Sequence, residues 1–331
     1  MSTPTARLLA DLEAQGLLPP AQATAIADDE RTRPFSLHYE LRALLYLGVV
    51  LLAGGLGGLV YQHLDSIGHE IIIGFIVLAM SASFWYAARH RPDFTWGEAP
   101  RTRIAADYLL LLGCLLFLVL EGYVQVQYQV FGTHYGLATL LPAGLFLALA
   151  YRYDHRGVLS LALTALATWV GVSVAPLAVF REGSFPTEIL EGPGFGLGLA
   201  LVVAGLLSED LGRKRHFAFT YLSLGSNLAL LAASALLFDA DGFILGLLWL
   251  LVVLVLSAGL VWYARRTQSY LFLLLAVAYS YVAVTYAVVM GLGHSHGSGD
   301  WFFFLVIFYF PLTLLWVVLL FINIKKILRI V

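Results

Sequence analysis

The sequence predicts an all-α fold: a polytopic bundle of about ten transmembrane helices, preceded by a small helical hairpin. Two observations predict this class. Of the 331 residues, 60% are hydrophobic and 12% are charged, whereas soluble domains contain about 25% charged residues. In addition, apolar runs long enough to cross about 30 Å of hydrocarbon recur from Leu41 to the end of the chain. The composition therefore excludes a water-soluble globular protein.

The apolar runs define the predicted spans one by one. Most are about 18–24 residues long, which is the length that a membrane-crossing helix needs. Backbone polar groups inside a membrane must be bonded within the chain, so each run is expected to be a helix. The predicted spans are 41–61, 70–88, 104–124, 135–151, 157–179, 193–208, 217–238, 242–263, 268–291 and 301–324.

Lysine and arginine predict the orientation of these spans. When the connections are numbered alternately, eighteen of the nineteen basic residues fall on one side, and the other side has only Arg181. Basic residues close to the ends of spans are retained in the cytoplasm. We therefore expect ten spans with both termini cytoplasmic. A missed or additional span would move every later loop to the opposite side and would destroy the asymmetry.

Residues 1–40 differ in composition from residues 41–331, which form the predicted ten-span domain. The first part predicts a cytosolic hairpin of two helices, one ending near Gly16 and one running from Pro20 to about Pro34. A segment of about 40 residues seldom buries enough surface to fold alone. Its leucines are therefore expected to pack on the membrane domain, on a second copy of the chain or on another protein.

The stretch from Leu9 to Ile26 carries a family resemblance. It reads Leu-Ala-Asp-Leu-Glu-Ala-Gln-Gly-Leu-Leu-Pro-Pro-Ala-Gln-Ala-Thr-Ala-Ile and precedes a polar linker and a glycine-rich first span. Over roughly the first 150 residues, the chain resembles bacterial predicted membrane proteins of the domain-of-unknown-function-2157 family. The resemblance implies a multi-pass protein of the bacterial inner membrane with a small cytosolic hairpin. It supplies no catalytic residue and no cofactor.

Glycines at a small-xxx-small spacing occur in the first and sixth predicted spans. They are Gly54 and Gly58 in the first span, and Gly194 and Gly198 in the sixth. These spans would be equivalent helices if the ten spans formed two inverted halves, a plan common in transporters. The same glycines could instead allow close packing of neighbouring helices. The sequence leaves a transport pathway and simple packing both open.

A short aromatic and basic pattern is repeated at the predicted inner ends of two spans. It reads Trp85-Tyr-Ala-Ala-Arg89 in the second span and Trp262-Tyr-Ala-Arg-Arg266 in the eighth. One interpretation is a repeated helical hairpin. The other is that aromatic residues and arginines mark a membrane interface wherever a helix leaves the bilayer.

Strongly polar side chains are scarce within the predicted spans. Glu70, Asp107 and Glu121 fall near span ends, and no ionisable group lies near a span midpoint. This distribution argues against transport driven by ions through a buried carboxylate. Asn227, near the middle of the seventh span, is expected either to hydrogen-bond another helix or to bind a substrate.

The predicted outer side carries histidines next to acidic residues. His294, His296 and Asp300 stand close together in its last loop. Imidazole and carboxylate suit zinc or copper, so this set is a possible metal site, and a solvated loop is the alternative. On the same side, residues 123–130 alternate apolar and amide side chains, which fits either an extended segment or the polar end of a longer helix.

The function predicted from the sequence is that of a non-enzymatic accessory or assembly component of the bacterial inner membrane. No catalytic motif, phosphate-binding loop or cofactor domain is present in the sequence. The near-neutral charge of -2 does not indicate a nucleic-acid partner. Membrane lipids, and a protein or a second copy bound through the hairpin, are the expected partners. The alternatives are a small-molecule or lipid transporter and an outer-face metal-binding sensor.

Overall fold

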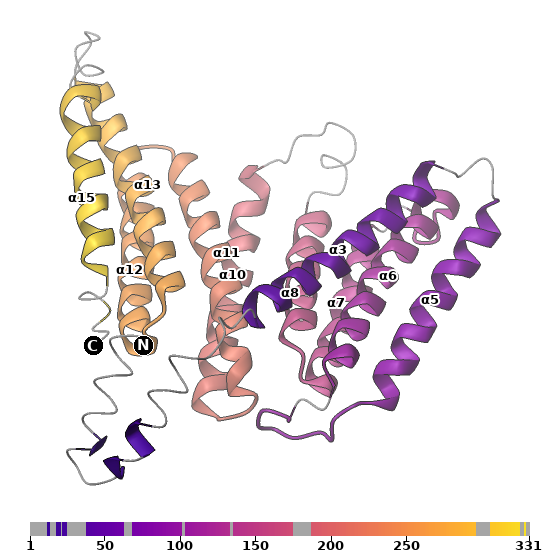
Figure 1. Cartoon of the computed structure of the whole chain (residues 1–331). Coiled ribbons are helices and arrows are strands. Elements are labelled where there is room, and N and C mark those ends of the chain that lie inside the picture. The colour runs from indigo at the N-terminus through magenta and orange to yellow at the C-terminus, as the bar shows by residue number, and fades with distance from the viewer. Residues whose placement is uncertain are drawn as a thin grey trace. The chain divides into compact units, whose positions relative to one another are not determined.

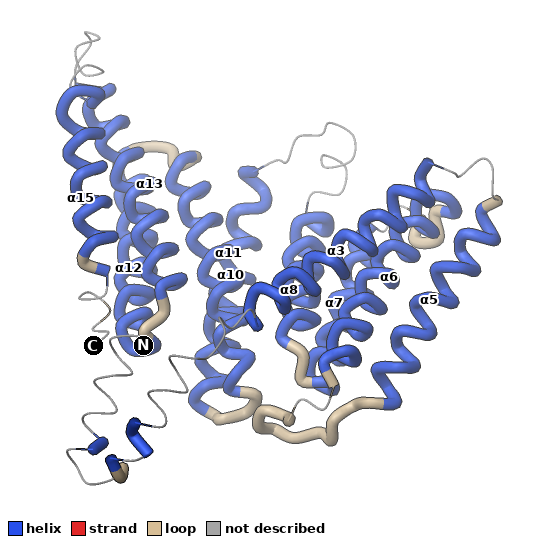
Figure 2. The backbone as a smooth tube through the Cα atoms, in the orientation of Figure 1, coloured by secondary structure: helices blue, strands red, loops and turns tan. Residues whose placement is uncertain are grey.

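The computed structural model confirms the all-α class (Figures 1 and 2). Helices and the loops between them make up the part of the chain that it describes. The chain divides into two compact units, Met1–Gln62 and His63–Val331, and each is described by itself. The described residues are 12–13, 18–20, 22–24, 38–62, 68–100, 103–132, 135–174, 187–295, 305–324 and 328.

The first unit contains helix α3 (His38–Gln62), which covers the first predicted span. A short helical segment precedes it. The Ala23 amide donates to the Pro19 carbonyl oxygen over 3.1 Å, so a helical turn begins at Pro20, as the sequence predicts. The remainder of the predicted hairpin lies outside the described residues, and the domain division at residue 40 stays a prediction.

The second unit contains the other long helices. In chain order, its elements are α5 (His69–Arg89), α6 (Ile104–Tyr128), α7 (Tyr135–Tyr153), α8 (Arg156–Val174), α10 (Thr187–Asp210), the 3₁₀ turn η1 (Arg215–Phe217), α11 (Ala218–Phe238), α12 (Phe243–Thr267), α13 (Tyr270–Ser295), the π-helical turn η2 (Leu305–Tyr309) and α15 (Phe310–Ile322).

The number of helices able to cross a membrane supports a multi-pass protein. Among the described residues, eight helices are long and apolar enough to span a bilayer. Two shorter apolar helical stretches lie at the first and last predicted spans. They are Ala43–Gly55 within α3 and Ile307–Leu320 across η2 and α15. Every predicted span therefore has an apolar helix at its place. The count of ten crossings and the orientation with both termini in the cytoplasm stay predictions.

Four helical hairpins build the second unit. The pairs α5–α6, α7–α8, α10–α11 and α12–α13 lie side by side (Figure 1). Their connections are residues 90–103, 154–155, 211–217 and 268–269. We call the end of the bundle formed by these four loops the basic end. It includes Arg89, Arg91, Arg152, Arg156, Arg213, Lys214, Arg215, Arg265 and Arg266.

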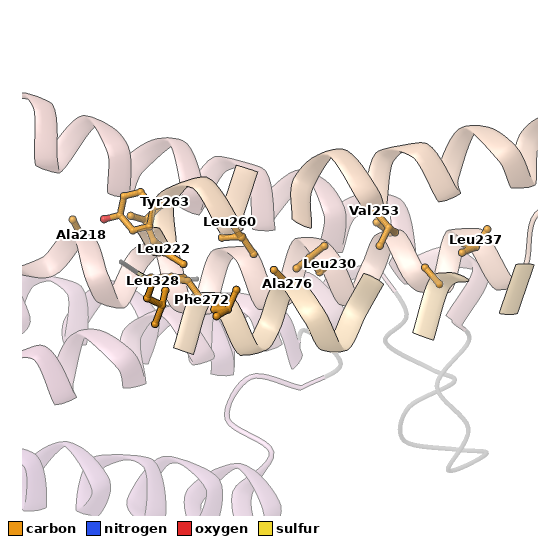
Figure 3. Packing of buried hydrophobic residues seen from close by; sticks show 14 residues of the cluster. Ala218, Leu222, Leu230, Leu237, Val253, Leu260, Tyr263, Phe272, Ala276 and Leu328 are labelled. Carbon is orange, nitrogen blue, oxygen red and sulfur yellow. The ribbon is translucent and has the colours of Figure 1, made fainter. Parts of the chain in front are cut away.

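Helix α11 lies at the centre of the main apolar core. Its residues Leu222, Leu230 and Leu237 pack with Val253 of α12 and Phe272 of α13 (Figure 3). Small residues let α11 approach its neighbours, because alanine, serine and glycine alternate with leucine along the helix. Close packing of small residues is how helices associate where hydrocarbon surrounds them.

The repeated Trp-Tyr-Ala pattern has a local explanation. The Arg89 guanidinium carbon lies 4.8 Å from the Trp85 ring centre, and that of Arg266 lies 5.8 Å from the Trp262 ring centre. Residues four apart meet on one face of a helix. Each pair is therefore a cation–π contact within one helix at the basic end, which agrees with the interface interpretation.

Helix α6 is longer than the third predicted span. It continues to Tyr128 and ends with Gln129 in the left-handed conformation, at φ 47°. The extended interpretation of residues 123–130 is therefore wrong, and the alternative of a longer helix is confirmed. The Gln125 side chain stabilises this end, because its Oε1 accepts from the Phe131 amide over 3.0 Å.

Candidate functional site

A buried ion cluster at the basic end is the most highly organised polar site in the described residues. It is centred on Asp154, the first residue after α7. The helix ends there because Asp154 is left-handed, at φ 58°, and the next amide, of His155, donates to the Ala150 carbonyl over 3.1 Å. This is the usual hydrogen-bond pattern of a helix C-terminus, and aspartate tolerates the left-handed conformation better than most residues.

Three groups from distant loops bind the Asp154 carboxylate. Lys214 Nζ lies 2.7 Å and His216 Nε2 lies 2.6 Å from Oδ1, and the Ala99 amide donates to Oδ2 over 2.6 Å. The Lys214 side chain is 1% exposed and that of Asp154 is 5% exposed. We call Asp154, Lys214, His216 and the Ala99 amide the Asp154 cluster.

The electrostatics of the cluster favour an ionised carboxylate. Burial by itself would raise the pKa of Asp154. The hydrogen bond from Lys214, the Ala99 amide and the charges of His216 and Lys214 act against burial and hold this pKa below its ordinary value. Because an ionised carboxylate can only accept, the hydrogen of the short histidine contact lies on His216 Nε2.

The lowered pKa of Asp154 predicts how its contribution to the stability of the fold changes with pH. A group whose pKa is lower in the folded state contributes stability above its ordinary pKa of about 4, and that contribution is lost as the pH falls through the lower folded value. We expect the difference in unfolding free energy between the wild type and Asp154→Asn to be constant from about pH 7 to 5 and to shrink below about pH 4. Denaturant unfolding in detergent at several pH values measures it. A difference that grows in acid would contradict the assignment.

The loop of residues 92–99 is fastened to the cluster at several points. The Lys214 amide donates to the Trp96 carbonyl over 2.7 Å, and Arg152 donates to the Pro92 carbonyl over 3.1 Å. Glu98 forms an ion pair with Arg156 over 3.2 Å. These bonds fix the loop without burying its aromatic side chains.

Two aromatic rings on this fastened loop stay largely accessible. Phe94 is 48% exposed and Trp96 is 52% exposed. Lys214 Nζ lies 5.4 Å from the Phe94 ring centre, and the Arg213 guanidinium carbon lies 5.1 Å from that of Trp96. We call Phe94, Trp96 and Arg213 the aromatic platform.

A second polar group extends the basic end toward α12. The Tyr263 hydroxyl donates to Glu209 Oε2 over 2.9 Å. The guanidinium groups of Arg215 and Arg266 lie 3.9 and 4.0 Å from Glu209 Oε1. Glu209 therefore links α10 to α12. Asp154 has the same kind of role, because it links the loop at 96–99 to the loop at 214–216.

The chemistry of the Asp154 cluster is that of a structural ion pair. Lys214 is ion-paired with the Asp154 carboxylate over 2.7 Å, and an ammonium group in such a pair has no free lone pair to act as a nucleophile. The neighbouring His155 caps the start of α8, because its Nδ1 accepts a hydrogen bond from the Val158 amide over 3.0 Å. Among the described residues, no three histidine, cysteine or acidic side chains are grouped to hold a metal.

Asn227 forms a hydrogen bond between helices. The Tyr279 hydroxyl of α13 donates to Asn227 Oδ1 of α11 over 2.5 Å. This contact confirms the first of the two predicted roles. Substrate binding at Asn227 stays a prediction.

The glycines of α10 pack against α11. A Cβ atom placed on Gly198 would lie 2.5 Å from the Ala229 amide nitrogen, and one on Gly194 would lie 3.6 Å from the Ala232 Cβ. Opposite them, a Cβ on Gly225 would lie 3.0 Å from the Gly198 carbonyl. At Gly54 and Gly58 of α3, a Cβ atom would have no neighbour within 4 Å in the described structure. A pathway role for these four glycines stays a prediction.

The predicted metal residues fall at the edge of the described chain. Helix α13 continues to Ser295, so the His294 backbone is helical instead of belonging to an extended loop. His296 and Asp300 lie outside the described residues. The zinc or copper site at His294, His296 and Asp300 therefore stays a prediction.

Sequence reasoning missed the Asp154 cluster. Asp154 is one of few acidic residues among the arginines of the basic end, and Lys214 and His216 stand in the run Arg213-Lys-Arg-His216. An acidic residue surrounded by basic loops is a signal that an ion pair could form. The sequence gives no sign of which cation is the partner.

The comparisons with known proteins agree with this architecture. Residues 10–159 match the profile of a family described as "Predicted membrane protein (DUF2157)". The matched region begins in the N-terminal segment and ends just inside α8, so it includes Asp154. Among curated proteins and solved structures, none matches the chain. Residues 10–159 are therefore similar to the DUF2157 family of predicted membrane proteins.

Proposed function

We propose that the protein is a non-enzymatic accessory or assembly component of the bacterial cytoplasmic membrane and that it binds a protein partner on the cytoplasmic side. The observation that carries this proposal is the aromatic platform. Phe94 and Trp96 are exposed, yet four bonds, one each to Pro92, Trp96, Glu98 and Ala99, hold the loop that carries them.

A fastened loop with exposed aromatic rings has the properties of a binding surface. Tryptophan and arginine are the residues that most often dominate the energy of protein interfaces. A surface that is already rigid loses little conformational entropy when a partner binds. The 92–99 loop would be cytoplasmic in the orientation that the lysine and arginine distribution predicts. The N-terminal hairpin would supply a second contact from the same side of the membrane.

Truncating the platform tests the proposal. Truncation of an aromatic hot spot costs about 2 kcal/mol or more in binding, which is roughly a 30-fold loss of affinity. We expect Trp96→Ala to lower the ratio of partner-bound to free protein by about that factor, at equal free partner concentration, in native mass spectra of gently extracted protein. Deletion of residues 1–36 is expected to remove the partner as well.

The matched control is Trp85→Ala. Trp85 is 60% exposed and is also stacked by an arginine at the basic end, but it lies on α5 instead of the fastened loop. We expect this variant to keep the partner. An unchanged set of associated proteins in both Trp96→Ala and the deletion variant would refute the proposal.

A transporter of lipids or small apolar molecules is the second candidate function. It is supported by an apolar groove of about 470 Å³ between α13 and α15, lined among others by Val277, Tyr281, Phe310 and Leu314. A groove of this size matches the volume of common ligand pockets. Native mass spectra that show a defined lipid and no protein partner would favour this candidate over an assembly role.

A further inference from the structure

Glu121 lies deeper in its helix than the sequence predicts. Because α6 continues to Tyr128, the residue stands seven positions before the end of the helix, about 10 Å at 1.5 Å per residue. It is five positions beyond the helix midpoint at Leu116, or about 8 Å. Half the thickness of the hydrocarbon layer is about 15 Å. A span centred on Leu116 therefore places the Glu121 carboxyl group inside the hydrocarbon layer.

The Glu121 side chain is half-buried, and one of its two carboxyl oxygens is enclosed. Its Oε1 is buried and has no hydrogen-bond partner within the described part of the chain. Phe117 and Cys114, one and two turns earlier, lie on the same face of α6. Cys114 is fully buried, and the Phe117 ring centre is 5.9 Å from that of Phe146 on α7. This face of α6 points into the bundle.

The nearest polar side chain on this face is already engaged. Gln125 lies one turn beyond Glu121, toward the helix end. Its Oε1 accepts from the Phe131 amide over 3.0 Å, and its Nε2 donates to the Gly132 carbonyl over 3.4 Å. The loop that follows α6 thus folds back onto Gln125, so the Gln125 amide is already bonded.

Few titratable groups lie at this end of the neighbouring helices. On α5 they are His69 and Glu70, and on α7 there is Tyr135. The last half of α8 carries none. His69 is bound to the opposite flank of α6, where its Nδ1 lies 2.7 Å from the Tyr123 hydroxyl. An ionised Glu121 would therefore have no cation to balance it among the described residues, and an unpaired buried carboxylate is much more costly than a neutral acid.

We propose that Glu121 is an intramembrane proton-binding site, a carboxylic acid that holds its proton inside the α5–α8 bundle at neutral pH. The neutral acid removes the cost of burying a charge, and the bound proton is released where water reaches the carboxyl group. This inference revises the prediction that Glu121 falls near the end of its span. It is independent of the proposed assembly role, because it rests on α6 and not on the aromatic platform.

Infrared spectroscopy of the full chain in lipid nanodiscs tests the proposal. A protonated carboxyl group has a C=O absorption that a carboxylate lacks and that shifts in heavy water. We expect the wild type at pH 7 to show such a band that is lost in Glu121→Gln and kept in Glu70→Gln, since Glu70 is exposed. Identical wild-type and Glu121→Gln spectra in this region at pH 7 would overturn the proposal.

Labelling with carbodiimides gives a second measurement. A protonated carboxyl group transfers its proton to a carbodiimide nitrogen while the carboxylate oxygen adds to the central carbon. The resulting O-acylisourea rearranges to a stable N-acylurea without loss of atoms. We expect apolar dicyclohexylcarbodiimide to modify Glu121 and a water-soluble carbodiimide to leave it unmodified. Equal modification by both reagents would show a solvated carboxyl group and would overturn the proposal.

Discussion

Replacement of Asp154 by asparagine is expected to lower the unfolding free energy of the second unit by about 3–5 kcal/mol, the usual cost of leaving one partner of a buried ion pair uncompensated. The Lys214 ammonium would stay buried without its counter-charge, since its side chain is 1% exposed. Asparagine also tolerates the left-handed backbone and keeps an oxygen that can accept from the Ala99 amide. The Asp154→Asn variant therefore removes the negative charge of the side chain and keeps its size and backbone conformation.

Two further variants make this experiment specific. Glu98→Gln breaks an exposed ion pair with Arg156 at the same end and is expected to cost about 1 kcal/mol or less. Combining Asp154→Asn with Lys214→Met removes both buried charges and is expected to recover most of the loss. Denaturant unfolding in detergent, followed by tryptophan fluorescence, measures all of them. Equal losses in Asp154→Asn and Glu98→Gln would mean that the Asp154 cluster does not stabilise the fold.

Replacement of Gly198 by leucine is expected to separate α10 from α11. A Cβ atom at this position would already lie 2.5 and 2.7 Å from the backbone nitrogen and Cα of Ala229. Overpacking against movable side chains costs about 1–3 kcal/mol. Here the obstructing atoms are backbone, so the helices must move apart, and we expect a loss at or above the upper end of that range.

Gly196 supplies the matched control for this variant. It lies two positions away on the same helix, and a Cβ atom there would have no neighbour within 4 Å. Gly196→Leu adds the same apolar volume and is expected to leave the melting temperature almost unchanged. Thermal unfolding of both variants in one detergent distinguishes close packing from a general intolerance of larger residues. Equal melting temperatures for the two variants would contradict the predicted contact.

The fold class was predictable because the bilayer imposes a simple rule on sequence. Long apolar runs must form helices there, and a helix stands at the place of every predicted span. The exact helix ends were less predictable. Hydropathy alternates in residues 123–130, so the sequence left an extended segment and the polar end of a longer helix both open. The structure shows that Gln125 bonds the following loop and so extends α6 to Tyr128.

The candidate site was harder to predict for a physical reason. The partners Asp154, Lys214 and Ala99 come from three loops that are 55 and 60 residues apart in sequence. Local patterns carry no information about such distant pairings. By contrast, Asn227 and Gly198 could be singled out, because a lone amide or a small-xxx-small pair within a span has few physical roles. Their partners Tyr279 and Ala229 required the structure.

The order in which the Asp154 cluster receives its parts has a consequence for biogenesis. During synthesis, Ala99 and Asp154 leave the ribosome well before Lys214 and His216. The Asp154 carboxylate therefore lacks Lys214 and His216 until the hairpin of α10 and α11 has been made. Once Lys214 is made, it links the hairpin of α10 and α11 to the two earlier hairpins, which the bonds at Pro92, Glu98 and Ala99 already join. We expect this step to complete the assembly of α5 to α11, so that nascent chains stopped before residue 214 are more sensitive to protease at the 92–99 loop than the full chain.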